Sequence, residues 1–146
     1  MDKKRVLLVE DDKEDVELIL EALETSMADI ILEIKHNGLE AYEYCTKQLT
    51  NSGSLPDLIL LDLNMPLMNG HEFMSKIKKN ESLKKIPVIV FTTSDAESDI
   101  NKSYQNGASC YITKPIGFDQ YEEIMESIKE LWLKHVKYPI SEINKF

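Results

Sequence analysis

Short runs of consecutive apolar residues alternate along the chain with longer stretches in which apolar residues recur every three or four positions. A run of four or five apolar residues bounded by polar residues, Pro or Gly is typical of a strand that is buried on both faces. This pattern predicts strands over 5–10, 31–35, 57–61, 88–91 and 109–113. The helical spacing predicts helices over 13–25, from Asn37-Gly38 onward, over 70–79, over 96–105 and from Phe118 to Trp132.

The strict alternation of strands and helices predicts an α/β fold with a doubly wound, five-stranded parallel sheet and five helices. Right-handed crossovers leave few topologies, and the flavodoxin-like strand order 2-1-3-4-5 is the natural choice. Ligands in such sheets bind at the carboxyl ends of the strands, here between the first and third strands. We expect one domain over 1–134 and a short tail, 135–146, without an effector domain.

Composition and charge narrow the functions that this chain can have. A formal net charge of −9 disfavours a nucleic-acid surface, which needs clustered Lys and Arg. Apolar stretches are too short for a bilayer span or a signal peptide, so we expect a cytoplasmic protein with no membrane partner. Cys45 and Cys110 are too far apart for a metal-binding or redox motif, and we interpret both as reduced packing residues.

Polar residues suited to binding metal and phosphate follow four of the predicted strands. Glu10 and Asp11 follow the first strand, and Asp62 follows the third. Thr92 follows the fourth strand, and Lys114 follows the fifth. Because the carboxyl ends of parallel strands share one edge of the sheet, we expect these side chains to converge. Repulsion among the carboxylates favours a divalent cation, and oxygen ligands on a partly open site suit Mg²⁺.

This set of side chains indicates phosphoryl transfer to a carboxylate. Asp62 is the expected nucleophile, and its attack on phosphorus would give an acyl phosphate. Mg²⁺, Lys114 and Thr92 are expected to neutralise the three equatorial oxygens. Each residue alone has a simpler explanation: Asp62 as a turn residue, Lys114 as a solvated lysine, and Thr92 as a strand-end hydroxyl.

Four segments together resemble the receiver domain of bacterial two-component response regulators. The resemblance covers about residues 4–132. The matching segments are Leu7-Leu8-Val9-Glu10-Asp11-Asp12, Leu60-Leu61-Asp62-Leu63-Asn64-Met65-Pro66 with Gly70, Phe91-Thr92-Thr93-Ser94 and Tyr111-Ile112-Thr113-Lys114-Pro115. Each segment alone is a weak signal, but all four in this order, each at a strand end, are highly specific.

The resemblance implies a phosphoacceptor and its metal ligands. Asp62 would accept the phosphoryl group, and Asp11 would bind Mg²⁺ directly. Glu10 would bind the metal through water, and Asn64 would offer its backbone carbonyl. Since the acidic pair of the family aligns with Glu10 and Asp11, we interpret Asp12 as the N-cap of the first helix.

The resemblance also implies residues that bind and read the phosphoryl group. These are Thr92 as the switch hydroxyl, Thr93 beside it, Lys114 as the phosphate-binding lysine and Tyr111 as an aromatic side chain that changes rotamer. A cis peptide bond is expected between Lys114 and Pro115. The phosphoryl donor would be a sensor histidine kinase, and the fourth helix, fifth strand and fifth helix would present a face to a partner or to a second copy in a homodimer.

A finer resemblance concerns the single-domain regulators that act with bacterial phytochrome histidine kinases. It is carried by the segments 91–94 and 110–114 and by Trp132, with Val136 and Pro139 beyond it. It implies a phytochrome-type kinase as the phosphoryl donor. The chain departs from those regulators at Pro115, because they often lack a proline after the lysine.

Two other functions are compatible with the same fold class. A Mg²⁺-dependent phosphatase with an aspartyl-phosphate intermediate commonly needs a second acid two residues after the nucleophile, where this chain has Asn64, so turnover should be slow. A flavin or nucleotide carrier would need a phosphate-binding loop after the first strand. The acids Glu10, Asp11 and Asp12 stand there instead and would repel a phosphate. We therefore expect a signalling protein rather than an enzyme.

Overall fold

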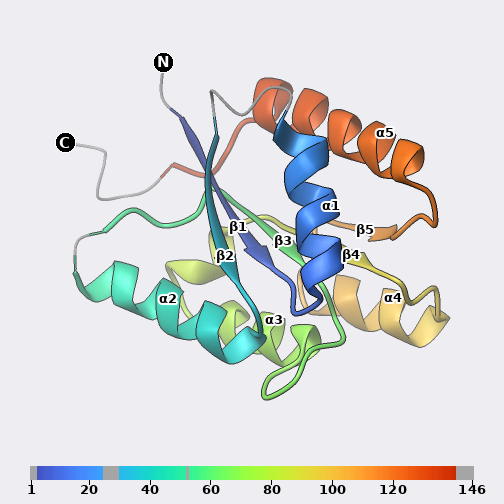
Figure 1. The fold of residues 1–146 in the computed structure, drawn as a ribbon. Coiled ribbons are helices and arrows are strands. Elements are labelled where there is room, and N and C mark those ends of the chain that lie inside the picture. The colour runs from blue at the N-terminus through green and yellow to red at the C-terminus, as the bar shows by residue number, and fades with distance from the viewer. Residues whose placement is uncertain (1–2, 25–29, 52, 141–146) are drawn as a thin grey trace.

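The computed structural model describes residues 3–24, 30–51 and 53–140, and its parallel sheet confirms the predicted fold class (Figure 1). The strands are β1 (Lys4–Val9), β2 (Ile30–Lys35), β3 (Leu58–Leu61), β4 (Val88–Thr92) and β5 (Cys110–Thr113). Neighbouring strands pair in parallel in the order β2-β1-β3-β4-β5. The chain therefore reverses its direction of winding between β1 and β3, where such sheets bind ligands.

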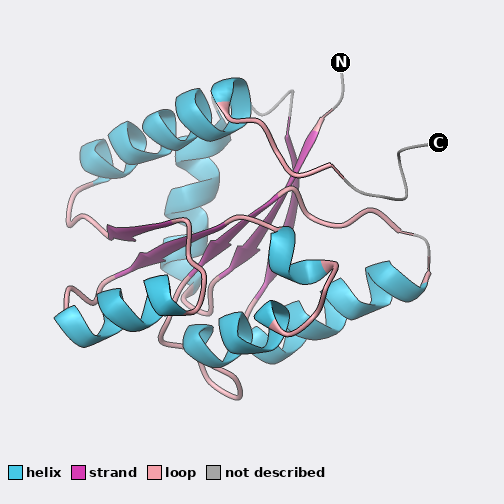
Figure 2. Ribbon diagram, turned by 180° about the vertical axis from the view of Figure 1, so that it is seen from behind, coloured by secondary structure: helices cyan, strands magenta, loops and turns pink. Residues whose placement is uncertain are grey.

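Helices cover both faces of the sheet (Figures 1 and 2). The α-helices are α1 (Lys13–Glu24), α2 (Gly38–Thr50), α3 (Gly70–Lys78), α4 (Glu97–Gln105) and α5 (Phe118–Ile128). A 3₁₀ turn, η2 (Leu83–Lys85), precedes β4. Helices α1 and α5 lie on one face, and α2, α3 and α4 lie on the other.

The alternation of side chains along β1 divides the core into two layers. Leu7 and Val9 pack with residues of α2 and α3, whereas Val6 and Leu8 pack with residues of α1 and α5. Cys45 is fully buried in the first layer, and burial raises the pKa of its thiol to about 12. Both cysteines are free thiols, so the prediction of reduced packing residues holds for Cys45, while Cys110 is half-buried beside the second layer.

Asparagine and glycine residues define the helix ends that border the site. Asn37 caps α2 by accepting a hydrogen bond from the Glu40 backbone N–H. Asn69 and Glu72 form a reciprocal capping box at the start of α3. Gly70 is required there, because a Cβ atom would lie 2.5 Å from the carbonyl oxygen of Asp62. The loop after β3 is thus pressed closely against the end of its own strand.

The last helix differs from the sequence prediction of one regular helix ending at Trp132. After α5 the chain continues as η3 (Lys129–His135), which has π-helical hydrogen bonding. The Tyr138 hydroxyl donates to the backbone carbonyl of Trp132, and the Lys4 ammonium lies 4.7 Å from the centre of the Tyr138 ring. The described part of the tail therefore folds back toward β1, and the remainder of the predicted tail lies outside the described residues.

Within the described ranges, no helix combines the length and the apolar character that a bilayer crossing requires.

Candidate functional site

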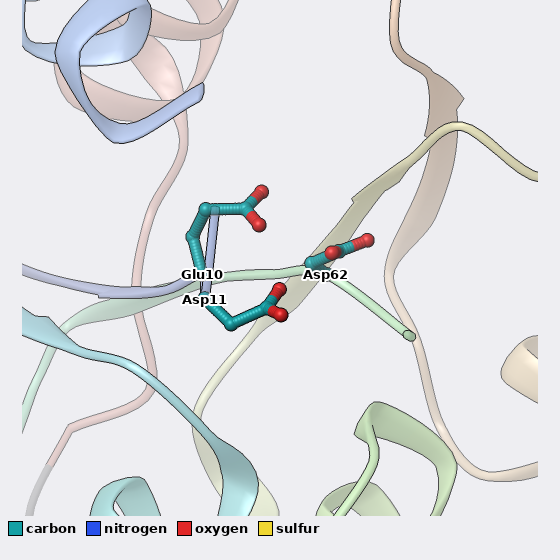
Figure 3. Close-up of side chains that lie close together, drawn as sticks. All are labelled: Glu10, Asp11 and Asp62. Carbon is teal, nitrogen blue, oxygen red and sulfur yellow. The ribbon is translucent and has the colours of Figure 1, made fainter. Parts of the chain in front are cut away.

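Three carboxylates meet at the carboxyl ends of β1 and β3. Val9 and Leu61 are register partners at the ends of these neighbouring strands, so the residues that follow them emerge side by side. Glu10 and Asp11 extend toward Asp62 (Figure 3), and one oxygen of each lies within 4.8 Å of the others. Glu10 and Asp62 are 1% and 7% exposed, whereas Asp11 is open to solvent. The convergence predicted for these three residues is therefore observed.

Backbone hydrogen bonds fix the two buried carboxylates. The Glu10 N–H donates to the Lys35 carbonyl at 2.9 Å, and the Asp62 N–H donates to the Val9 carbonyl at 3.0 Å. The Leu63 N–H donates to Asp62 Oδ1 at 2.8 Å. Because Oδ1 is held in this way, Oδ2 is the Asp62 oxygen that faces Lys114.

Lys114 brings a buried positive charge from the end of β5. Its Nζ lies 2.5 Å from Glu10 Oε1, 2.8 Å from Asp15 Oδ2 and 3.7 Å from Asp62 Oδ2. The side chain is only 3% exposed, so water does little to screen these interactions. Lys114 is thus directed at the acidic cluster, as the sequence predicts, and also contacts Asp15, which the sequence did not single out.

The electrostatics of the cluster favour an added cation. Burial raises the pKa of Glu10 to about 8, and the charge of Asp62 adds to the rise, while Lys114 offsets part of it. Burial alone would lower the pKa of Lys114, but hydrogen bonds to Asp15 and Glu10 outweigh it and raise that pKa above its usual value. Two carboxylates at the 4.8 Å limit of this cluster repel each other by about 3 kcal/mol at an effective dielectric near 20. Lys114 supplies one positive charge against three acids.

The donor set fits a hard divalent cation. All three side chains offer carboxylate oxygens, which suit Mg²⁺ or Mn²⁺ better than the softer metals that prefer nitrogen or sulfur. Asp11 is exposed, which leaves an open side for water or a phosphoryl oxygen. Asn64 lies two residues after Asp62 in an exposed position of the following loop.

Asp12 has the role predicted for it. Its Oδ1 accepts hydrogen bonds from the backbone N–H groups of Glu14 and Asp15, at 2.8 and 3.2 Å. This is N-capping of α1. Asp12 is therefore engaged at the helix end and is not part of the three-carboxylate cluster.

Thr92, the last residue of β4, presents a polar atom that lacks a partner. The residue is fully buried, and its Oγ1 has no hydrogen-bond partner among the described residues. Thr93, next to it, is exposed. Tyr111 on β5 is half-buried, and its hydroxyl donates to the Ser94 carbonyl at 2.8 Å. Tyr111 is thereby tied to the loop that follows Thr92.

The expectation of a cis bond before Pro115 is wrong. The peptide bond between Lys114 and Pro115 is trans. The trans isomer is favoured by about 0.5–1 kcal/mol for bonds to proline, and Lys114 reaches Glu10 with the bond in this form.

Sequence reasoning missed two groups of residues: one contacts Lys114, and the other includes Ser94, whose carbonyl binds Tyr111. Asp15, in the first turn of α1, accepts hydrogen bonds from Lys114 and from the Tyr121 hydroxyl. His71 Nε2 lies 2.9 Å from Asp99 Oδ1, and the Ser94 hydroxyl donates to Asp99 Oδ2 at 2.6 Å. The only signal for Asp15 is its place in the first turn after the acidic motif, and His71 and Asp99 are separated by 28 residues.

Comparisons with known proteins give one consistent result. The family model described as response regulator receiver domain matches residues 6–128. The response regulator Rcp1 of Synechocystis sp. is 42% identical over 137 residues, which are 93% of this chain and 93% of Rcp1.

Two solved structures are similar over nearly the whole chain. The phosphorylated cyanobacterial phytochrome response regulator RcpA has a TM-score of 0.87 and 41% identity, covering 94% of this chain and 99% of RcpA. The Mn²⁺-bound form of Rcp1 has a TM-score of 0.84 and 40% identity, with the same two coverages.

Proposed function

Because the chain belongs to the response regulator receiver domains, we propose that it accepts a phosphoryl group on Asp62 from a sensor histidine kinase. Phosphorylation would then change the conformation of the face formed by α4, β5 and α5. The observation that supports this proposal is the placement of buried Asp62 beside Glu10 and Asp11, with the buried Lys114 ammonium 3.7 Å from its Oδ2.

The geometry suits nucleophilic attack by Asp62. An Asp62 oxygen forms a bond to phosphorus while the bond from phosphorus to the kinase histidine nitrogen breaks. The electron pair of that bond stays on the imidazole, which then takes up a proton. Lys114, 3.7 Å from Asp62 Oδ2, would balance charge on the transferred group, and the Thr92 hydroxyl, which has no partner within the described residues, would be a further donor.

Glu10, Asp11, Asp62 and the backbone carbonyl of Asn64 are the proposed ligands of Mg²⁺. When bound, the cation would neutralise negative charge on the carboxylates and the phosphoryl oxygens. Supporting this assignment are the carboxylate cluster itself and the solved Mn²⁺-bound form of the related Rcp1.

A phytochrome-type kinase is the proposed phosphoryl donor. The support is that RcpA, which is similar over 94% of this chain, is a phytochrome response regulator.

We further propose that the protein works in the cytoplasm and that residues 1–134 form the receiver domain. The face formed by α4, β5 and α5 is the proposed surface for partner binding or for a homodimer. Tyr104 of α4 is 49% exposed, so its aromatic ring is accessible to a partner that binds this helix.

A phosphatase is not favoured by the site. The residue two positions after Asp62 is Asn64, whose amide cannot exchange a proton as a general acid or base. The aspartyl phosphate would therefore be a signalling state rather than a rapidly hydrolysed intermediate.

Phosphotransfer from radiolabelled, autophosphorylated histidine kinases, including phytochrome-type kinases, tests the proposal. Wild-type protein and the control Asp95→Asn, which alters an exposed acid in the loop after β4, should take up label only when Mg²⁺ is present. Asp62→Asn should take up none. Stable label on Asp62→Asn would assign the acceptor to another residue.

A further inference from the structure

Lys114 has a carboxylate partner that acceptance of a phosphoryl group does not require. Asp15 lies in the first turn of α1, outside the three-carboxylate cluster, and its Oδ2 accepts a hydrogen bond from Lys114 Nζ at 2.8 Å. Its other oxygen, Oδ1, accepts from the Tyr121 hydroxyl at 3.1 Å. Asp15 therefore connects Lys114 at the end of β5 to Tyr121 in α5.

Tyr121 holds Asp15 from a fixed position. The residue is 3% exposed, and its ring packs edge-on against Phe91, with centroids 5.6 Å apart and planes at 84°. Since each oxygen of Asp15 accepts from a different buried donor, the carboxylate is oriented and not free to rotate.

Lys114 and a metal ion would share the same two carboxylates. Lys114 Nζ lies 2.5 Å from Glu10 Oε1 and 3.7 Å from Asp62 Oδ2, and both residues belong to the cluster that would bind the cation. A cation bound to these carboxylates would neutralise them and repel the ammonium. With 3% exposure, the Lys114 side chain has little access to water, and a buried ammonium without an anion is strongly unfavourable.

We propose that Asp15, oriented by Tyr121, is a positioning residue that retains the Lys114 ammonium when a divalent cation takes over Glu10 and Asp62. Asp15 thereby keeps Lys114 paired beside the pocket, ready for the phosphoryl group, and makes metal binding more favourable. The proposal rests on the metal site of the proposed function.

Isothermal titration with Mg²⁺ alone, at fixed ionic strength, tests this role. Asp15→Asn should weaken Mg²⁺ binding about tenfold or more, because Lys114 then has to leave Glu10 without an anionic partner. Asp12→Asn is the matched control: it removes one charge from the same helix end, still caps the helix, and does not contact Lys114. It should weaken Mg²⁺ binding only about threefold, because the charge that is lost attracts the cation only at long range and is screened by salt.

A double-mutant cycle separates action through Lys114 from a general effect of charge. In the Lys114→Met background, Asp15→Asn should cost no more than Asp12→Asn does, since there is no ammonium to retain. Tyr121→Phe changes no charge and should weaken Mg²⁺ binding about twofold to fivefold by releasing Asp15. Tyr104→Phe, at an exposed tyrosine of α4, is its control and should have no effect.

The outcomes distinguish this role from the proposed function. Wild-type protein that binds no Mg²⁺ would overturn the metal site itself. Wild-type binding with equal losses in Asp15→Asn and Asp12→Asn, or an excess loss that persists without Lys114, would overturn only the role of Asp15. Thermal melts establish that each variant is folded. If Asp15→Asn does not fold, the Mg²⁺ affinities of Tyr121→Phe and Tyr104→Phe decide whether Asp15 has this role.

Discussion

Thr92 carries a hydroxyl that is fully buried and, within the described part of the chain, unpaired. Leaving such a group unsatisfied costs about 1–3 kcal/mol in a folded protein. This cost makes sense if the hydroxyl gains a partner in another state of the protein, and phosphorylated Asp62 would offer three strong acceptor oxygens. The unpaired Thr92 hydroxyl is thus an unfavourable feature of this state, which the proposed phosphorylation of Asp62 would relieve.

Thr92→Val should therefore separate stability from signalling. The unphosphorylated variant is expected to be more stable than wild type by about 1 kcal/mol, since the shape is kept and the unpaired hydroxyl removed. It should still bind the phosphoryl mimic beryllofluoride with Mg²⁺, but lose the mimic-dependent change in association measured by light scattering. Thr50→Val, at an exposed threonine in the last turn of α2, is the control and should behave as wild type. A normal response by Thr92→Val would remove Thr92 from the switch.

The elements show what single-sequence reasoning can and cannot reach. β3 was predicted because Leu58–Leu61 is an unbroken apolar run, and every residue in it is buried. The acids and Lys114 were placed because strand ends in a parallel sheet share an edge. The contact of Asp15 with Lys114 spans 99 positions and depends on how α1 lies against β5, which no local pattern encodes. The π-helical turn after Ile128 was missed because its residues keep ordinary helical spacing.

The connection between α3 and α4 leads to a prediction about pH. The Ser94 hydroxyl, and then His71, hold the pKa of Asp99 below its usual value by hydrogen bonding. A carboxyl with a lowered folded-state pKa contributes stability above its unfolded value near 3.8, and loses it as the pH falls through the lower folded value. Since the Asp99 side chain is 33% exposed and water screens its interactions, the contribution is expected to stay below about 1 kcal/mol.

Urea unfolding of wild type and Asp99→Asn checks this expectation. Wild type should be the more stable protein at pH 7, and the difference should shrink as the pH falls below about 3.8, the unfolded-state pKa of Asp99. Asp95→Asn, at an exposed acid of the same loop, is the control. A difference between wild type and Asp99→Asn that grows on acidification would contradict the hydrogen-bonded arrangement.

At the scale of the whole molecule, the three-carboxylate cluster is expected to make stability depend on divalent cations. A ligand that binds only the folded state adds about 2.7 kcal/mol at one hundred times its dissociation constant. For a chain of 146 residues, that corresponds to a rise in Tm of roughly 5–10 °C. Removing Mg²⁺ with a chelator should reverse it.

Thermal melts with and without Mg²⁺ measure this effect. Asp11→Asn removes an exposed carboxylate of the cluster, so Mg²⁺ should raise its Tm much less than that of wild type. Asp12→Asn should show most of the wild-type rise in Tm. Equal rises in wild type and Asp11→Asn would mean that the stabilising ion binds elsewhere.

Two sets of contacts near the site lie on opposite faces of the sheet. Lys114–Asp15–Tyr121 lies on the side of α1 and α5, and Ser94–Asp99–His71 lies on the side of α3 and α4. Because the fully buried strands β3 and β4 stand between them, a substitution in one set is expected to leave the contacts of the other set in place. If the proposed roles hold, separate substitutions can therefore alter metal binding at Asp62 and recognition of a partner independently.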